Sequence, residues 1–535
     1  MPANFNSVFA PLQDSELCQR LANWLPEQRW FAGKSKRIER VSISDLVRLP
    51  TRDAGEPYGL AFVDVLFADG VHDLYLIPLE LTELRESLSP RFWWDLLQAL
   101  FIEGVELPTL AGGVMRATRA AAFDPQVIAR LGQQALQVHG GQQSNTSVSV
   151  GEAYFLKLFR RPAVGANPDV EIGRFLTERS QTAYQNTPAL VGTIELQAAT
   201  GEQRCLAILS NRLSAEGDAW TYSLQALGQF WQRLLRTQPE VATPPTIDWR
   251  FGAWRLGGDR SELPAVAREL VAGFIDDASL LGRRTGELHV ALASDATSAD
   301  FAPEPLSSAT LSQLIDGIRE EITTTEQLLR DRREVVERHH AQTLAAEFGR
   351  RAHELLDSLT SSGLSPQCDL IRVHGDYHLG QVLRTADDFH IIDFEGEPDR
   401  PLAERRQKRP VFKDVAGMIR SFHYASNAGA VGLIDGLDEL PPSIDLRAWQ
   451  QFWFATTARA FLGAYRTVTI DTRLLPSDSG EAQRLLDVFI LEKAMYELRY
   501  ELNNRPDWAL IPLIGLSDVL ERATPPYIAG ALNRR

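Results

Sequence analysis

The pattern of apolar and polar positions divides the chain into a part rich in predicted strands and a longer part that is mostly helical. In the first part, apolar spacing predicts one helix, three strands and an aromatic-rich segment, at residues 15–24, 41–49, 59–67, 72–81 and 92–94. From residue 218 onward, amphipathic helical runs follow at 224–235, 314–356, 449–465 and 482–502. Residues 294–312, rich in Ala, Ser, Pro and Asp, predict a loop. The predicted fold class is therefore α+β.

Two short apolar runs in the second part end in acidic residues. Asp376 comes just after the run 370–373, and Asp393 closes the run 389–392, so each carboxylate falls where a strand gives way to a loop. Loops held by rigid strands are favourable places for chemistry. Gln381 follows Asp376 by five residues, which is the spacing of the aspartate and the amide in the protein-kinase catalytic loop.

This spacing predicts a role for each polar residue. Asp376 would orient an acceptor hydroxyl and take its proton, while Gln381, Asp393 and Glu395 would supply the hard oxygen ligands that Mg²⁺ prefers. Kinases have asparagine at the position of Gln381. The extra methylene of glutamine moves the amide outward, so the metal would sit slightly differently or share more of its charge with Glu395. A single His-Gly-Asp is usually only a tight turn, but two such motifs in one segment favour a magnesium-dependent phosphotransferase.

A lysine for the triphosphate lies upstream, in the apolar run 153–159. A lone lysine such as Lys157 in a β-rich run usually guards an edge strand. The next segment has helical spacing, however, and carries Glu171 in its first turn after the linker 162–168. We therefore predict the pair of strand lysine and helix glutamate that positions the α- and β-phosphates of ATP.

Two further segments are candidates for contacts with ATP. Ser144, Asn145 and Thr146 lie in a predicted hairpin over the phosphates, although a plain polar turn is the simpler interpretation of that segment alone. The run 205–213 is the predicted hinge between two lobes, where the backbone at Leu209 and Asn211 would meet the adenine edge.

Taken in order, these segments resemble the maltokinase family, bacterial kinases related to aminoglycoside phosphotransferases that make maltose 1-phosphate. The resemblance extends along most of the chain, through residues 29–34 (Arg-Trp-Phe-Ala-Gly-Lys), 144–147, 281–289, 374–381, 393–398, 400–406 and 413–422. It implies a bilobal, protein-kinase-like fold that uses ATP and Mg²⁺. Relatives with the same motifs act on glucosamine, so the motifs are less specific for the sugar than for the family.

The resemblance also implies a domain organisation. Residues 1–125 would form an N-terminal cap, residues 126–213 the nucleotide-binding small lobe, and residues 214–535 a helical C-terminal lobe with the catalytic loop and the acceptor site. The product would feed α-glucan synthesis from trehalose, with trehalose synthase as a candidate partner.

The acceptor site is predicted mainly from one helical segment, residues 491–500. Lys493, Tyr496, Glu497 and Tyr500 share one face at helical spacing, and an aromatic and charged face suits a disaccharide. Tyrosines at this spacing more often face a core, so it is the resemblance that favours sugar binding. His378 and Glu397 are predicted to complete the site, and Trp508 is a second candidate wall.

Composition excludes several classes of protein. Three cysteines in 535 residues are too few for a disulfide framework or a zinc site, which favours a reducing cytoplasm. We expect no targeting segment in the first residues, because no basic stretch is followed there by an apolar core. No apolar run in the sequence reaches membrane-spanning length. A net charge of -15 argues against nucleic acid or a membrane as partner, so local cations must help to hold ATP. One such cluster, which is equally compatible with a solvated loop, contains Arg405, Arg406, Lys408, Arg409 and Lys413.

Two alternatives stay open at this stage. The acceptor is glucosamine or another amino sugar if Glu395, Glu397 and Glu497 serve a cationic substrate. Alternatively, the chain is an inactive kinase-like partner of a trehalose-metabolising enzyme, with the cap as its docking surface. The joint presence of the predicted catalytic set argues against inactivity: Lys157, Glu171, Asp376, Gln381 and Asp393.

Overall fold

The computed structural model describes residues 15–521 apart from 35, 51–56, 83–84, 133–134, 141–144, 180–183, 238–243, 249–264, 272, 361–365 and 436–443. The chain folds as two compact units. The first comprises Met1–Arg179, Thr187–Ser214 and Arg400–Glu404, and the second comprises Ser180–Asn186, Ala215–Asp399 and Arg405–Arg535. The finer boundary between cap and small lobe at residue 125 remains a prediction.

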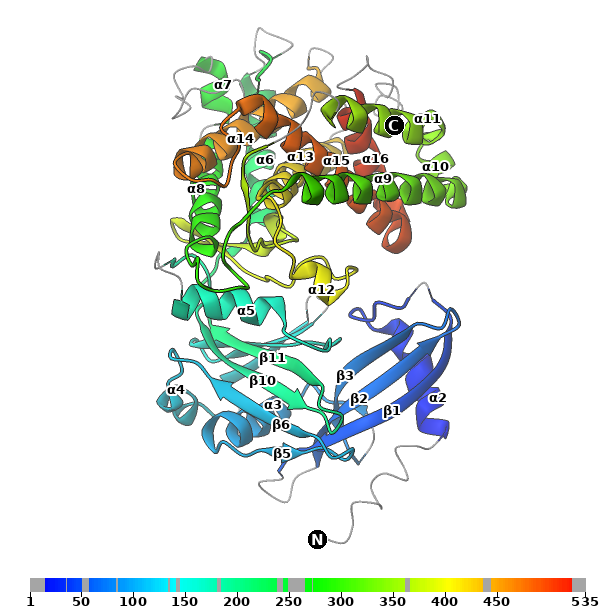
Figure 1. Ribbon diagram of the computed structural model, residues 1–535, viewed down its shortest axis with the longest axis vertical. Coiled ribbons are helices and arrows are strands. Elements are labelled where there is room, and N and C mark those ends of the chain that lie inside the picture. The colour runs from blue at the N-terminus through cyan, green and yellow to red at the C-terminus, as the bar shows by residue number, and fades with distance from the viewer. Residues whose placement is uncertain are drawn as a thin grey trace. The chain divides into compact units, whose positions relative to one another are not determined.

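The N-terminal part of the first unit is a sheet with a helix packed on it. The antiparallel sheet has the order β1-β2-β3-β4, and α2 packs against β1 (Figure 1). The elements are α2 (Ser15–Trp24), β1 (Ile38–Arg48), β2 (Tyr58–Phe67), β3 (His72–Glu80) and β4 (Arg85–Glu86). The helix and the three longer strands lie where the hydrophobic pattern predicted them, because their apolar side chains are buried in the two cores of this unit.

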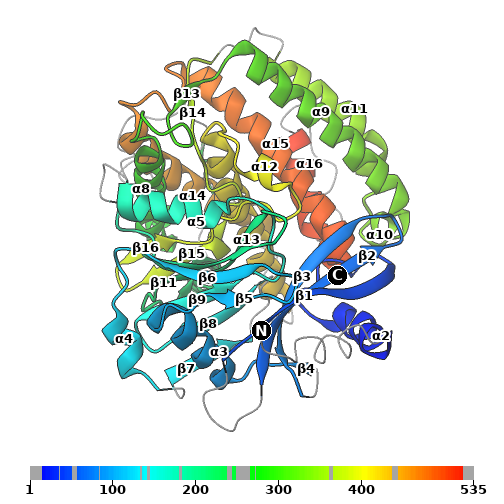
Figure 2. The same ribbon diagram turned by 60° about the horizontal axis from the view of Figure 1, so that its bottom comes forward.

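A larger sheet forms the rest of the first unit, in the order β5-β6-β10-β11-β9-β8-β7 (Figure 2). Its strands are β5 (Leu107–Pro108), β6 (Val114–Arg119), β7 (Leu136–His139), β8 (Thr146–Val150), β9 (Tyr154–Leu158), β10 (Leu190–Gln197) and β11 (Gln203–Asn211). Its helices are α3 (Pro90–Leu97), α4 (Pro125–Arg130) and α5 (Pro168–Arg174). The predicted lysine strand is therefore β9, beside β11 in the interior of the sheet.

Strand β2 connects two hydrophobic cores. Its residues Ala61, Val63 and Val65 face a core shared with α2, whereas Leu60 and Phe62 face a core shared with α3 and the seven-stranded sheet. Successive side chains of a strand point to opposite faces, so this division follows directly from the apolar run. The two sheets of the first unit are thus joined by buried apolar side chains.

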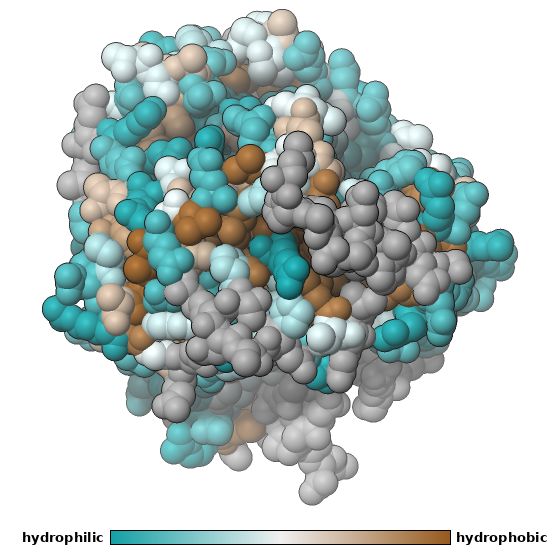
Figure 3. Space-filling model, turned by 90° about the horizontal axis from the view of Figure 1, so that it is seen from below, coloured by the Kyte–Doolittle hydropathy of each residue, from teal (hydrophilic) through white to brown (hydrophobic). Residues whose placement is uncertain are grey.

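The surface of the first unit carries scattered apolar side chains. Figure 3 shows hydrophobic residues between hydrophilic ones on the face that it presents. The large apolar side chains of this unit that are exposed include Val71, Leu88, Val105 and Val164, which belong to four separate connections between elements. Such scatter is ordinary for a folded protein.

The second unit is predominantly helical. Helix α8 packs along α14, and α13 packs against both α14 and α15. Its helices are α6 (Ala219–Thr237), α7 (Ala265–Leu270), α8 (Phe274–Leu292), α9 (Ser308–Asp331), α10 (Arg333–Arg338), α11 (Gln342–Thr360), α13 (Phe412–Asp435), α14 (Leu446–Thr469), α15 (Ser479–Asn504) and α16 (Leu510–Glu521). In a short helix, α12 (Leu402–Arg405), the chain passes from the first unit to the second after Glu404.

Two expectations for this unit need correction. The amphipathic run 314–356 is three helices, α9, α10 and α11, because Arg332 and His340 leave helical geometry, His340 with a φ of +55°. Amphipathic spacing continues across both breaks, so the sequence hid them. The predicted loop 294–312 is also too long, since Ser307 caps α9 by accepting a hydrogen bond from the Thr310 amide.

Short strands carry the predicted catalytic segments. β12 (Gly217–Asp218), β15 (Val382–Thr385) and β16 (Asp388–Ile391) form one sheet, and β13 (Glu304–Pro305) pairs with β14 (Asp369–Leu370). Asp393 follows β16 as predicted, whereas β14 ends before the predicted run 370–373 does. Among the described residues, none of the helices has the length and apolar character to span a membrane.

Candidate active site

The loop that carries Asp376 is anchored to the start of α13. The backbone N–H groups of His374 and Gly375 donate to the two carboxylate oxygens of Asp414, at 2.7 and 2.8 Å. Gly375 has a φ of +86°, and a Cβ there would lie 3.3 Å from the Cα of Gly396. Glycine therefore suits this turn both by its conformation and by the close approach of the Asp393 loop.

Residues of helix α8 support the same loop. His289, fully buried, donates through Nε2 to Asp414 at 3.0 Å, and its Nδ1 lies 2.9 Å from the Tyr465 hydroxyl. The hydroxyls of Thr285 and Tyr377 are 2.8 Å apart. Burial raises the pKa of Asp414, but hydrogen bonds from His289 and backbone amides outweigh it and lower the pKa. The α8 segment, one of those that carry the family resemblance, thus fixes the catalytic loop.

A second set of contacts joins the two predicted motifs. His374 Nε2 donates to the Ile392 carbonyl at 2.9 Å, and the Ile392 amide donates to the Gln381 carbonyl at 3.0 Å. His374 is therefore a loop-fixing group, as the sequence indicated. His378 accepts a hydrogen bond from the Gly380 amide through Nδ1 at 3.0 Å, so it also fixes local geometry.

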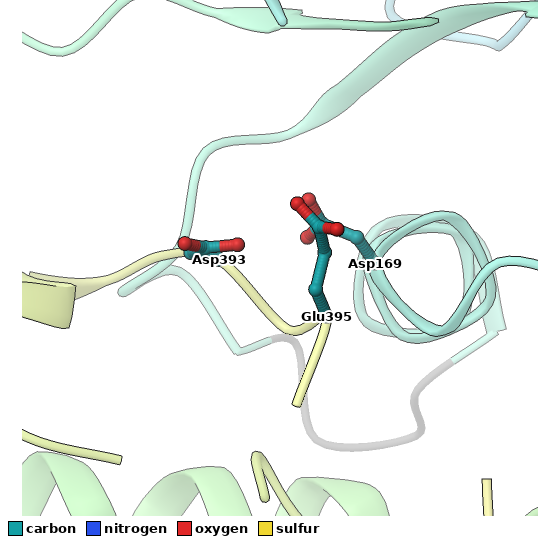
Figure 4. A group of neighbouring side chains, drawn as sticks. All are labelled: Asp169, Asp393 and Glu395. Carbon is teal, nitrogen blue, oxygen red and sulfur yellow. The ribbon is translucent and has the colours of Figure 1, made fainter. Parts of the chain in front are cut away.

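The predicted metal ligands converge at the end of β16. The side-chain amide of Gln381 donates to Asp393 Oδ2 at 2.9 Å, and Asp393 holds a φ of +68°, which is rare outside glycine. Asp393 and Glu395 are two residues apart on one loop (Figure 4). Gln381 contacts Asp393, and carboxylate oxygens of Asp393 and Glu395 lie within 4.8 Å of each other, so this group of oxygen donors fits Mg²⁺.

Asp376 is held by a lysine from α15. Lys493 Nζ lies 2.8 Å from Asp376 Oδ1 and 3.4 Å from Glu397 Oε1. Glu397 is 1% exposed and also contacts Lys413 Nζ at 3.1 Å, and Lys413 in turn reaches Glu492 at 3.1 Å. Carboxylates and ammonium groups therefore alternate along one buried chain.

This chain sets the protonation of the candidate base. Burial raises the pKa of Asp376, but Lys493 and His378 more than offset it, so the pKa is lowered. Burial lowers the pKa of Lys493, yet Asp376 and Glu397 outweigh it and raise the pKa. The pKa of His378 is lowered, chiefly by burial. Near neutral pH the site holds an ionised Asp376, a charged Lys493 and a neutral His378.

The residues of α15 that were predicted to contact the sugar also contact other side chains of the protein. Lys493 lies 4.5 Å from the Tyr496 ring centroid, and the Tyr496 and Tyr500 rings are stacked at 6.4 Å. Glu497, predicted as a sugar contact, forms an ion pair with Arg420 at 2.7 Å. Burial raises the pKa of both tyrosines, so their hydroxyls remain protonated donors.

The lysine of β9 lies beside a carboxylate that the sequence did not favour. Lys157 Nζ lies 3.0 Å from Asp169 Oδ2. Asn167 caps α5 by accepting from the Asp169 amide, with Pro168 in the first turn, and this places Asp169 at the helix start. Glu171 is one half-turn further on. Lys157 thus lies beside a carboxylate in the first turn of α5, and that carboxylate is Asp169, while the pairing with Glu171 stays a prediction.

The remaining predicted contacts with ATP lie in the larger sheet. Ser144 is outside the described residues. Asn145 and Thr146 lie at the start of β8, and Leu209, fully buried, is inside β11, opposite Leu156 of β9. The Asn211 amide donates to the Ala189 carbonyl at 2.9 Å, so the end of β11 is tied into the sheet.

The basic cluster after the Asp393 loop is occupied by contacts within the protein. Lys408 pairs with Glu304 at 2.5 Å, Arg406 with Asp300 at 3.5 Å, and Arg405 donates to the Glu395 carbonyl at 3.2 Å. The basic cluster therefore holds loops in place.

Trp508, the second candidate wall of the acceptor site, is 47% exposed, and the Arg505 guanidinium lies 5.8 Å from the Trp508 ring centroid.

Sequence reasoning missed three residues. Asp169 shares the first helical turn with Glu171, and helical spacing alone does not choose between them. Asp414 lies in a segment that carried the family resemblance, but nothing local marks its contact with a loop 40 residues earlier. Arg160, which is buried just after β9 and donates to the Thr146 hydroxyl, gave no signal, because an arginine after a strand is ordinary.

Comparison with known proteins supports the architecture. Residues 24–92 match the maltokinase N-terminal cap domain. A glucosamine kinase of Streptacidiphilus jiangxiensis is 33% identical over 151 residues, which span 28% of this chain and 32% of that protein. A glucosamine kinase of Mycolicibacterium smegmatis is 24% identical over 387 residues, 71% of this chain and 79% of that protein.

Solved structures show the same fold. Glucosamine kinase in crystal form B has a TM-score of 0.56 at 22% identity, covering 90% of this chain and 94% of that one. Glucosamine kinase in complex with glucosamine, ADP and inorganic phosphate has a TM-score of 0.54 at 20% identity, covering 93% and 99%. The chain thus carries a maltokinase-type cap on the α+β fold of these kinases, which confirms the predicted resemblance to the maltokinase family.

Proposed function

We propose that this chain is an ATP-dependent sugar kinase that phosphorylates maltose at its anomeric hydroxyl. The observation that carries the proposal is the position of Asp376, which is anchored by Asp414, paired with Lys493 and linked to the Gln381 and Asp393 pair. Fixed carboxylates of this kind orient an acceptor and stabilise a transferring phosphoryl group.

Asp376 acts on the acceptor. Its ionised carboxylate accepts a hydrogen bond from the sugar hydroxyl and takes the proton as the sugar oxygen bonds to the γ-phosphorus and the bond to the β,γ-bridging oxygen breaks. The products are the sugar phosphate and ADP. Since Lys493 lowers the pKa of Asp376, the base is weak, and a weak base suits the most acidic hydroxyl, which is the anomeric one.

Gln381, Asp393 and Glu395 would hold Mg²⁺, which neutralises charge on the β- and γ-phosphates. In the first unit, Lys157 would meet the α- and β-phosphates, with Asp169 holding the ammonium in place between turnovers. The backbone at the end of β11, at Asn211, is the proposed contact for adenine, because Leu209 lies further inside the strand, between β10 and β9.

The predicted acidic sugar contacts near Asp376 already have cationic partners, which favours a neutral acceptor over an amino sugar. Glu397 is shared by two lysines and Glu497 is paired with Arg420, so their carboxylates already have cationic partners. Lys493, charged and 2.8 Å from Asp376, would repel a substrate ammonium group. Tyr496 and Tyr500 offer rings and neutral hydroxyls to a second glucose unit, whose binding energy would favour a disaccharide.

Glucosamine is the second candidate, because the relatives described above are named glucosamine kinases. Measuring kcat/KM for maltose, glucose and glucosamine, with each product identified by phosphorus NMR, separates the two. We expect maltose to be preferred and its product to be the 1-phosphate. A preference for glucosamine, or a 6-phosphate product, overturns the maltose proposal and leaves the kinase proposal intact.

Association with trehalose synthase and a place in α-glucan synthesis follow only from the family resemblance. Size-exclusion chromatography of the mixed proteins tests the association, and co-elution is the expected result. Two separate peaks at micromolar concentrations would contradict a stable complex. Turnover of any sugar by the purified chain would in turn exclude an inactive, purely docking role.

A further inference from the structure

Arg160 is a buried charge whose purpose the proposed activity leaves unexplained. It is 1% exposed and lies two residues beyond the end of β9, three residues after Lys157. Burying a guanidinium is costly unless its donors are satisfied. The contacts of Arg160 run in two directions, and each direction ends on a different part of the first unit.

In one direction Arg160 contacts the N-terminal sheet. Its guanidinium pairs with Glu86 of β4, donates to the Leu76 carbonyl of β3 at 3.3 Å, and lies 4.5 Å from the Trp30 ring centroid. The Leu76 amide also donates to the Arg160 carbonyl at 2.8 Å. Glu86, Leu76 and Trp30 all fall within residues 24–92, which match the maltokinase cap domain.

In the other direction Arg160 holds the beginning of β8. Its Nε donates to the Thr146 hydroxyl at 2.6 Å, and its backbone N–H donates to the Asn145 side-chain oxygen at 3.2 Å. Asn145 and Thr146 are two of the residues proposed to contact the phosphates of ATP. Arg160 therefore contacts both the cap and the beginning of β8.

The Arg-Trp-Phe-Ala-Gly-Lys segment at residues 29–34 gains a purpose from this arrangement. Phe31 packs against Tyr75 at 5.0 Å between ring centroids, and the Arg160 guanidinium lies over the ring of the neighbouring Trp30. A Cβ at Gly33 would lie 2.4 Å from the Phe67 ring, so a larger residue would displace this aromatic platform. The segment is built for close packing beneath the arginine.

We propose that Arg160 is a positioning residue that fixes Asn145 and Thr146 from the cap, so that the cap sets the affinity for ATP. The planar fork of a buried arginine satisfies several acceptors in one geometry and resists rearrangement. Small misplacements of a binding group lower the yield of productive complexes steeply. The nucleotide part of this proposal rests on the proposed ATP-dependent activity.

Arg160→Lys tests the proposal with the charge retained for Glu86 and the fork removed. Arg161→Met is the matched control, because Arg161 is adjacent and pairs with Asp73 of β3 at 2.6 Å, over the Tyr75 ring at 6.0 Å. We expect the Kd and KM for ATP to rise about tenfold in Arg160→Lys, with the KM for the sugar unchanged. The control should match the wild type in all three constants.

Two further measurements keep the test decisive. Trp30→Leu, which preserves every charge, should raise the Kd for ATP in the same direction by a smaller factor. Hydrogen exchange at the Asn145 and Thr146 amides should be about tenfold faster in Arg160→Lys without any nucleotide. Unchanged exchange and an unchanged Kd for ATP in the folded variant overturn the proposal. Failure of the wild type to bind ATP overturns the proposed function instead, while the exchange result still decides the role of Arg160.

Discussion

Charges are buried in different ways in the two units. In the second unit, carboxylates and ammonium groups alternate in one chain, with successive contacts of 2.8, 3.4, 3.1 and 3.1 Å through Asp376, Lys493, Glu397, Lys413 and Glu492. In the first unit, the two cations near the end of β9 face separate carboxylates, Lys157 with Asp169 and Arg160 with Glu86.

The chain of charges and the ion pairs suit different chemical roles. A continuous chain shares each lysine between two carboxylates, so it holds its members rigid and tunes their protonation together. A lysine paired with a carboxylate of another element, as Lys157 is with Asp169, can exchange that carboxylate for a phosphate, whereas Arg160 is fixed by several acceptors. Rigid acid and base chemistry is therefore expected in the second unit, and exchangeable phosphate contacts in the first.

Loss of a metal ligand should produce the largest effect. Asp393→Ala removes one of the proposed metal ligands, so we expect activity to fall by at least about 10³-fold at ordinary magnesium concentrations. Steady-state turnover over a magnesium titration measures it. Asp387→Ala, an exposed aspartate in the hairpin before Asp393, is the control and should behave as wild type. Full activity of the Asp393 variant, or turnover without a divalent ion, would remove the metal from the scheme.

Substitution of the base should come next. Asp376→Asn keeps the shape of the side chain but cannot accept the sugar proton, so kcat should fall by roughly 10² to 10⁴. ATP binding, measured by titration calorimetry, should remain near that of the wild type. Turnover close to wild type in a folded variant would mean that another group, or only solvent, takes the proton.

The separate pair in the first unit is tested by Lys157→Ala, for which we expect kcat/KM for ATP to fall about 10²-fold. The two candidate carboxylates provide an internal comparison. Asp169→Asn should lower kcat/KM more than Glu171→Gln, because Asp169 is the residue that lies 3.0 Å from Lys157. The reverse order would favour Glu171 as the functional partner of Lys157, as the sequence did.

How far the sequence could predict the molecule differs between local and distant contacts. Strands β1 to β3 and the segment ending at Asp393 were found because alternation and turn chemistry are local properties. The choice of Asp169, the contact of Asp414 with His374, and the reach of Arg160 to Glu86 depend on packing between segments 12, 40 and 74 residues apart. No local pattern encodes such distances, so the residue types were predictable and their partners were not.

The smallest expected effect is a shift in pH dependence, and it tests whether the charge chain tunes the base. Burial and Glu397 both raise the pKa of Asp376, and Lys493 is the foremost group that lowers it. In Lys493→Met the pKa of Asp376 should therefore rise, so the carboxylate is protonated at higher pH and the acidic limb of kcat/KM moves upward by about one pH unit. Lys413→Met, which removes a partner of Glu397 and Glu492 instead, should move the limb less. If Lys493 acted only as a sugar ligand, its loss would raise the KM for maltose at every pH and leave the limb in place.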